Sequence, residues 1–177
     1  MDLFILMLAI PLVSGALLTV VGERAWAPNL NVIASAGTFL ASALLTAEIV
    51  AAGPRFAFGD NFFIDSMNVF FVALTAFVGL TTSIFSGPYM RNEREHGKLT
   101  APRLRLYKSM FQLFMFTMLA ALTTNNLGIL WVAMEAATLT TVLLVSLYRT
   151  AASLEAAWKY FILCGVGIAQ ALFGTIL

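Results

Sequence analysis

The sequence predicts an all-α fold, a polytopic transmembrane bundle of about six helices, and three observations support this prediction. Hydrophobic residues make up 60% of the 177 residues. Charged residues make up only 11%, whereas a soluble domain carries about a quarter, so a water-facing surface cannot be built. The apolar residues also form long charge-free runs such as Leu3–Gly22 and Ser66–Met90, and a run of about 18 or more apolar residues can span a bilayer as a helix.

The first half of the chain contains three of these segments. We expect helices over Leu3–Val21, Asn29–Ala52 and Asp65–Met90. Asp65 is expected to cap the third helix, because an aspartate in this position accepts hydrogen bonds from the first free N–H groups of a helix. Before it, Gly53–Asp60 carries Gly-Pro and Gly-Asp turn signals around alternating aromatic residues. This pattern predicts a small hairpin at the membrane interface, on the extracytoplasmic side.

The second half contains a stretch from Lys108 to Arg149 in which Glu135 is the only charge. At 1.5 Å per residue, a single helix of these roughly 40 residues would measure about 60 Å, which is twice the hydrocarbon thickness. The polar cluster Thr-Thr-Asn-Asn lies near its middle. We therefore expect two helices, Lys108–Leu122 and Leu127–Tyr148, and a sixth over Ser153–Leu177. No polar tail follows the sixth helix, so we expect a truncated or split chain.

Positive charges are distributed unequally between the two ends of the predicted bundle. The opposite end carries Arg55 alone, whereas the loops after the first, third and fifth helices carry eight basic residues: Arg24, Arg91, Arg94, Lys98, Arg103, Arg105, Lys108 and Arg149. This bias places the basic loop between the third and fourth helices in the cytoplasm and the N-terminus outside. We expect the basic loop to contact phospholipid. The net charge of +1 gives no reason to expect a nucleic acid partner.

Glu135 lies near the middle of the fifth predicted helix. A charge there costs about 2.5–3.5 kcal/mol on insertion scales. Because a low-dielectric environment disfavours the ionised form, such a carboxyl group can hold and release a proton near neutral pH, as a relay requires. The alternative is a protonated glutamate that hydrogen-bonds to a neighbouring helix. Thr138, one turn away on the same face, is a candidate support for the carboxyl group, and its alternative is a bond to its own helix.

Lys159 lies in the sixth predicted helix, about 9 Å from its start. A glutamate and a lysine on adjacent helices titrate as a coupled unit, so a proton gained by one changes the proton affinity of the other. The alternative is a lysine whose ammonium extends to the interface. Glu155 is either a surface partner of Lys159 or a switch that holds Lys159 away from Glu135. Gln170 either extends this polar track or forms an interhelical hydrogen bond.

The chain contains one cysteine, Cys164, and one histidine, His96. These numbers exclude a structural disulfide, a Cys-rich iron–sulfur site and a bis-His haem within the chain. We therefore expect no catalytic residue, cofactor or metal site here, and we place any redox chemistry in a partner protein.

Two stretches of the sequence resemble a known family. They are LTTNNLGILWVAME at Leu122–Glu135 and SLEAAWKYFI at Ser153–Ile162. Both resemble the antiporter-like, proton-translocating membrane subunits of respiratory complex I and its relatives. Within that family they most closely resemble component F of hydrogenase-4 or formate-hydrogenlyase-type complexes. The resemblance covers the whole chain and is most specific over Lys108–Leu177.

The resemblance implies the N-terminal portion of a 14-helix antiporter-like fold in a bacterial inner (plasma) membrane. Residues 1–107 would hold three accessory helices with the hairpin and the basic loop. Residues 108–177 would hold the start of the first proton-translocating repeat, truncated before the broken seventh helix. Glu135 matches the family's helix-5 glutamate and Lys159 its helix-6 lysine, both on the proton path.

The implied function is a proton- or cation-translocating membrane subunit, or a fragment of one, in a redox-driven oxidoreductase complex. Its partners would be other membrane subunits, the lipid bilayer and protons, with Na⁺ as an open alternative. Two other functions stay open: a structural membrane anchor of the same complex without transport of its own, and a monovalent cation/H⁺ antiporter module.

Overall fold

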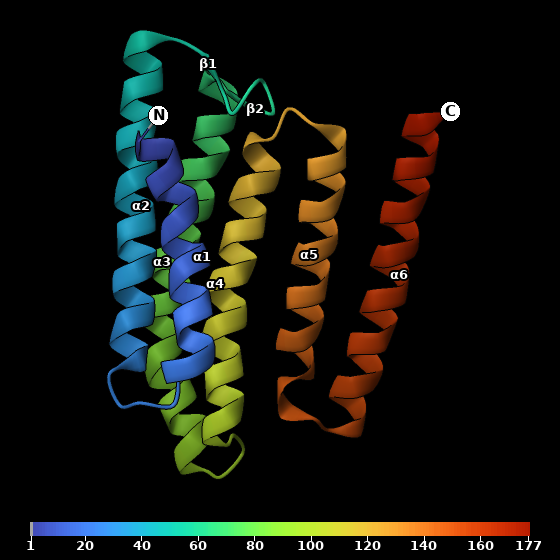
Figure 1. Cartoon of the computed structure of the whole chain (residues 1–177). Coiled ribbons are helices and arrows are strands. Elements are labelled where there is room, and N and C mark those ends of the chain that lie inside the picture. The colour runs from blue at the N-terminus through green and yellow to red at the C-terminus, as the bar shows by residue number, and fades with distance from the viewer. Residues whose placement is uncertain (1) are drawn as a thin grey trace.

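The computed structural model describes residues 2–177 as six long helices and one small hairpin (Figure 1). In chain order the elements are α1 (Asp2–Val21), α2 (Ala27–Ala52), β1 (Arg55–Ala57), β2 (Phe62–Ile64), α3 (Ser66–Glu95), α4 (Ala101–Thr123), α5 (Leu127–Val145), a 3₁₀ turn (Ser146–Tyr148) and α6 (Ala151–Ile176). Six helices, with α5 taken together with its 3₁₀ turn, are long and apolar enough to cross a membrane. The predicted all-α transmembrane bundle is confirmed.

The helices alternate in direction, so their connections gather at two ends (Figure 1). The N-terminus, the hairpin, the α4–α5 turn and the C-terminus lie at one end, which we call the hairpin end. The α1–α2, α3–α4 and α5–α6 connections lie at the other, which we call the basic end, since it holds the eight basic residues named above. Which end faces the cytoplasm remains a prediction.

The polar stretch between α3 and α4 is mostly helical, and the expected helix boundaries there were wrong. Helix α3 continues beyond Met90 to Glu95, and α4 begins at Ala101 rather than at Lys108. Arginine, lysine and glutamate are good helix formers, and Pro102 lies in the first turn of α4, where proline is tolerated. Hydropathy identifies the part of a helix inside the bilayer and misses the part beyond it. The predicted boundary at residues 107/108 therefore falls inside α4.

The predicted hairpin is present but lies further along the chain than expected. Strand β1 pairs antiparallel with β2, with Phe56 opposite Phe63. The chain turns at Phe58, Gly59 and Asp60, all of which have positive φ. Directly after β2, the Asp65 carboxylate accepts hydrogen bonds from the N–H groups of Met67 and Asn68 at 3.1 and 2.7 Å. The predicted cap of α3 is thus confirmed.

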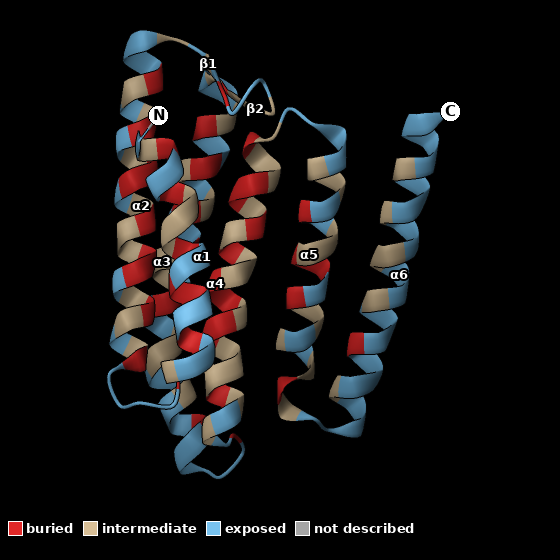
Figure 2. Cartoon of the chain, in the orientation of Figure 1, coloured by how far each residue is buried: buried red, intermediate tan, exposed pale blue. Residues whose placement is uncertain are grey.

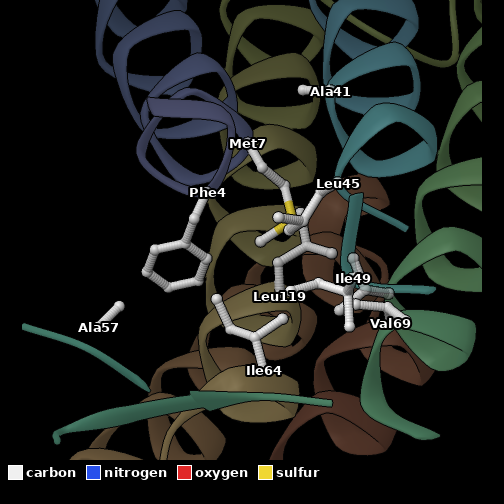
Figure 3. Close-up of a cluster of buried hydrophobic side chains, with 10 residues drawn as sticks. Phe4, Met7, Ala41, Leu45, Ile49, Ala57, Ile64, Val69 and Leu119 are labelled. Atoms are coloured by element: carbon white, nitrogen blue, oxygen red, sulfur yellow. The ribbon is translucent and has the colours of Figure 1, made fainter. Parts of the chain in front are cut away.

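Burial is concentrated in α1–α4 (Figure 2). An apolar cluster near the hairpin joins α1, α2, α3 and α4 with the two strands (Figure 3); it consists of Phe4, Met7, Ala41, Leu45, Ile49, Ala57, Ile64, Val69, Val72 and Leu119. In contrast, Ala157 is the only buried residue of α6, and Figure 2 shows α6 largely exposed along its length. The bundle therefore consists of a well-packed four-helix part and a more open pair, α5 and α6.

Candidate functional site

The α4–α5 turn positions the helix that carries Glu135. The Asn126 side chain caps α5 by accepting hydrogen bonds from the N–H groups of Gly128 and Ile129 at 2.9 and 3.2 Å. Its amide nitrogen also donates to the Asn61 side chain of the hairpin at 3.1 Å, and the Asn125 N–H donates to the Asn61 carbonyl at 2.8 Å. The polar cluster predicted to break the long apolar stretch thus joins α5 to the hairpin.

Glu135 lies eight residues after the start of α5, which is about 12 Å along the helix and well inside the membrane-spanning segment. Its side chain is half-buried. Among residues 2–177, no hydrogen bond or ion pair involves its carboxylate. An acid without a partner at this depth is costly, so it needs a proton or a counter-charge.

Trp131 is a polar neighbour that the sequence reasoning missed. Its indole N–H is buried, and no acceptor lies within hydrogen-bonding distance in the described part of the chain. Residues four apart lie on the same helix face, so this donor and the Glu135 carboxyl group share one side of α5. The signal was present in the sequence as the spacing of four between a tryptophan and a mid-membrane glutamate.

Thr138 follows the alternative given for it. Its hydroxyl is buried and donates to the Met134 carbonyl of its own helix at 3.1 Å. No hydrogen bond joins it to Glu135 in the described residues. Support of the Glu135 carboxyl group by Thr138 therefore stays a prediction.

The structure pairs Lys159 with Glu155 rather than with Glu135. The Lys159 ammonium lies 2.5 Å from the Glu155 carboxylate, and the two side chains are 70% and 65% exposed. By helix rise, Lys159 lies about 12 Å from the basic end of α6 and Glu135 about 20 Å from the same end of the α5 segment. The two groups are therefore offset by about 8 Å along the bundle, on neighbouring antiparallel helices. Gln170, also on α6, is exposed.

These groups can exchange protons and reorganise ion pairs. Within residues 2–177, no cluster of His, Cys, Asp and Glu is suited to hold a metal ion. The arrangement offers one acid without a partner, one exposed acid–base pair on the next helix, and a free indole donor beside the acid. Such groups suit proton transfer or helix packing.

Comparisons with known proteins agree with this architecture. The chain is 56% identical over 119 residues to a hydrogenase-4 component F homolog of Methylacidiphilum infernorum, a match that covers 67% of this chain and 25% of the relative. It is 28% identical over 193 aligned positions to the NADH-quinone oxidoreductase subunit L of Mycobacterium tuberculosis, covering 97% of this chain and 29% of the relative. The chain thus spans between a quarter and a third of the length of these relatives. No family model matches it.

A solved structure has the same fold. A chain of the membrane-bound sulfane sulfur reductase, an archaeal respiratory membrane complex, superimposes with a TM-score of 0.82 at 20% identity, covering 98% of this chain and 36% of that chain. The fold is therefore one found in respiratory membrane complexes. The sequence and fold comparisons together confirm the predicted resemblance: this chain is a relative of the membrane proteins named hydrogenase-4 component F and NADH-quinone oxidoreductase subunit L.

Proposed function

We propose that this chain is a proton- or cation-translocating part of a membrane subunit in a redox-driven respiratory assembly. Glu135 is the switchable acid, Lys159 the base, and Glu155 the residue that holds Lys159 while Glu135 is protonated. One observation carries this proposal: Glu135 lies near the middle of its membrane span without a counter-charge, while the nearest base along α6 is held by another carboxylate.

Electrostatics supports the switch. Two unit charges about 10 Å apart interact by about 2 kcal/mol at an effective dielectric constant of about 20. A Glu–Lys pair at positions i and i+4 of a helix contributes only about 0.2–0.5 kcal/mol. Ionisation of Glu135 would therefore be enough to draw the Lys159 ammonium away from Glu155. Protonation of Glu135 would let it return, and this cycle couples a proton to a charge movement.

The remaining parts of the proposal follow from the relatives. Residues 108–177 begin the translocating repeat, and residues 1–107 form accessory helices beside it. The basic end faces the cytoplasm of a bacterium, and the N-terminus lies outside. Electron transfer takes place in partner proteins, and the ion moved is H⁺, with Na⁺ as the alternative.

The test measures proton uptake and redox turnover together, in inverted membrane vesicles that contain the native assembly. Glu135→Gln keeps the shape of the side chain but removes its acid group, so uptake per redox turnover is expected to fall several-fold while the amount of assembled protein stays constant. Glu95→Gln, at the exposed end of α3, is the matched control and should leave uptake unchanged. Unchanged uptake in Glu135→Gln would contradict the proposal.

The anchor function is the second candidate, and two bonds favour it. Thr138 is satisfied by its own helix, and Lys159 is already neutralised by Glu155, so these groups have no need of Glu135. In that case Glu135→Gln leaves transport intact, whereas Glu135→Leu and Lys159→Leu lower the amount of assembled complex. The antiporter alternative stays a prediction, and Na⁺/H⁺ exchange by the purified 177-residue chain in vesicles would support it.

A further inference from the structure

A cavity of about 380 Å³ lies at the basic end, away from Glu135 and Lys159. The start of α2, the end of α3 and the start of α4 surround it. Its wall combines four basic residues with apolar side chains, among them Arg24, Arg91, Arg94, Lys108, Met90 and Leu104. The question is which ligand suits a pocket that is both cationic and apolar.

The positive charge of this cavity is not balanced within the chain. Glu23 is the only acidic residue in its wall, and Glu23 forms an ion pair at 3.0 Å with Arg105, which lies outside the wall. Among residues 2–177, neither Arg91 nor Arg94 forms an ion pair. The Arg24 guanidinium lies over the Trp26 ring, 5.9 Å from its centre, which leaves its charge without a carboxylate.

Lys108 is the most informative member of the wall. It is only 9% exposed, and its ammonium donates one hydrogen bond, to the Gly22 carbonyl at 2.9 Å. An ammonium group has three donors, so two remain without a protein acceptor. A buried cation is costly unless an anion pairs with it. An anion in the cavity would supply both the charge and the missing acceptors.

Two helix N-termini add to this positive field. Ala25 and Pro28 at the start of α2, and Ala101 at the start of α4, belong to the wall. At both helices the N-cap residue, Trp26 or Thr100, makes no side-chain hydrogen bond, whereas the N-termini of α3, α5 and α6 are capped by side chains. The free N–H groups and the positive end of the helix dipole favour an anion there.

The depth of the cavity identifies the source of the anion. Helix α1 has 20 residues and measures about 30 Å, which matches the hydrocarbon thickness. Gly22 follows its last residue, so the bond from Lys108 to Gly22 lies at the level where phospholipid phosphates begin. Met90 and Leu104 provide an apolar surface beside the cations. We propose that this cavity binds the phosphate headgroup of an anionic phospholipid, with an acyl chain along its apolar wall.

The inference does not depend on proton translocation, and it is tested by binding. The native assembly, depleted of lipid in detergent, is titrated with phosphatidylglycerol or with phosphatidylcholine, and the bound lipids are counted by native mass spectrometry. The wild type is expected to retain phosphatidylglycerol selectively. The double variant Arg91→Gln/Arg94→Gln should bind it about tenfold more weakly, since each basic residue near an anionic lipid contributes appreciably.

The control is Arg55→Gln/Lys98→Gln, which removes the same net charge outside the cavity wall and should bind phosphatidylglycerol like the wild type. Equal binding by both double variants would overturn the proposal. So would displacement of the lipid by millimolar inorganic phosphate, which would identify a soluble anion as the ligand. If the Arg91/Arg94 variant loses a partner protein while its lipid binding is unchanged, the cavity belongs to an acidic protein segment instead.

Discussion

Helices α1–α4 and the pair α5–α6 treat their polar side chains in opposite ways. In the first part, polar groups bond across helices: Gln112 of α4 is fully buried and donates to Asn31 and Ser35 of α2. In the second part, the Glu135 carboxylate has no partner among the described residues, and the pair Glu155–Lys159 faces outward. Polar groups inside membranes normally face protein or water. The four-helix part is therefore completed by its own contacts, whereas α5–α6 presents polar groups to whatever packs beside it.

The same substitution in the two parts should give the largest contrast. Leu119→Ala removes a side chain of 0% exposure from the cluster near the hairpin, and the lost packing should lower the free energy of unfolding by about 2 kcal/mol or more. Leu163→Ala acts on an α6 side chain that is 74% exposed and should change it by less than about 0.5 kcal/mol. Reversible unfolding in mixed detergent–SDS micelles measures both. An equal loss in the two variants would mean that protein covers the outer face of α6.

Glutamine replacements sharpen the contrast for polar groups. Gln112→Leu leaves the Asn31 side-chain oxygen buried without its donor at 2.9 Å, which should cost about 1–2 kcal/mol. Gln170→Leu alters an exposed residue of α6 and should be close to neutral in the isolated chain. The same unfolding measurement compares them. If Gln170→Leu lowers the amount of this protein only within the native assembly, Gln170 bonds to a neighbouring helix there, as one of the two interpretations of its position predicts.

The number and type of elements could be predicted because the bilayer imposes them. A spanning helix requires about 20 apolar residues, so charge-free runs identify all six. Asp65 could be recognised as a cap because capping depends on residues adjacent in sequence. The ends of α3 and α4 could not be placed, because their charged residues form helix equally well outside the bilayer.

The candidate site was harder to predict than the helices that carry it. Lys159 has two candidate carboxylate partners, and the local i,i+4 partner Glu155 is the one that it contacts. No sequence pattern decides between a partner on the same helix and one on the next. The cavity at the basic end was also beyond sequence reasoning, because it depends on a bond between Lys108 and Gly22, which are 86 residues apart. Positive charge at that end could be counted, but its enclosure could not.

Asn126 tests how firmly the open pair is joined to the packed part. Asn126→Ala removes the cap of α5 and the bond to Asn61 of the hairpin, and should cost about 1 kcal/mol. Thr150→Ala removes a single capping bond, to the Ser153 N–H of α6, and should cost less. Hydrogen exchange of α5 amide groups provides a local readout, with faster exchange at the start of α5 expected in Asn126→Ala alone. Equal exchange in both variants would show that helix packing, rather than the turn, holds α5 in place.

Two exposed ion pairs provide the smallest expected effect on stability and the sharpest separation of function from stability. Glu23 pairs with Arg105 in the four-helix part, and Glu155 pairs with Lys159 on α6. Exposed pairs contribute little, so Glu23→Gln and Glu155→Gln should each change the free energy of unfolding by less than about 0.5 kcal/mol. Only Glu155→Gln should alter proton uptake in vesicles, because it releases Lys159 from its local partner and leaves it free to move toward Glu135 in both protonation states of that acid. Equal uptake in the two variants would leave Glu155 as a surface partner of Lys159, and the proposed switch would then have to operate without it.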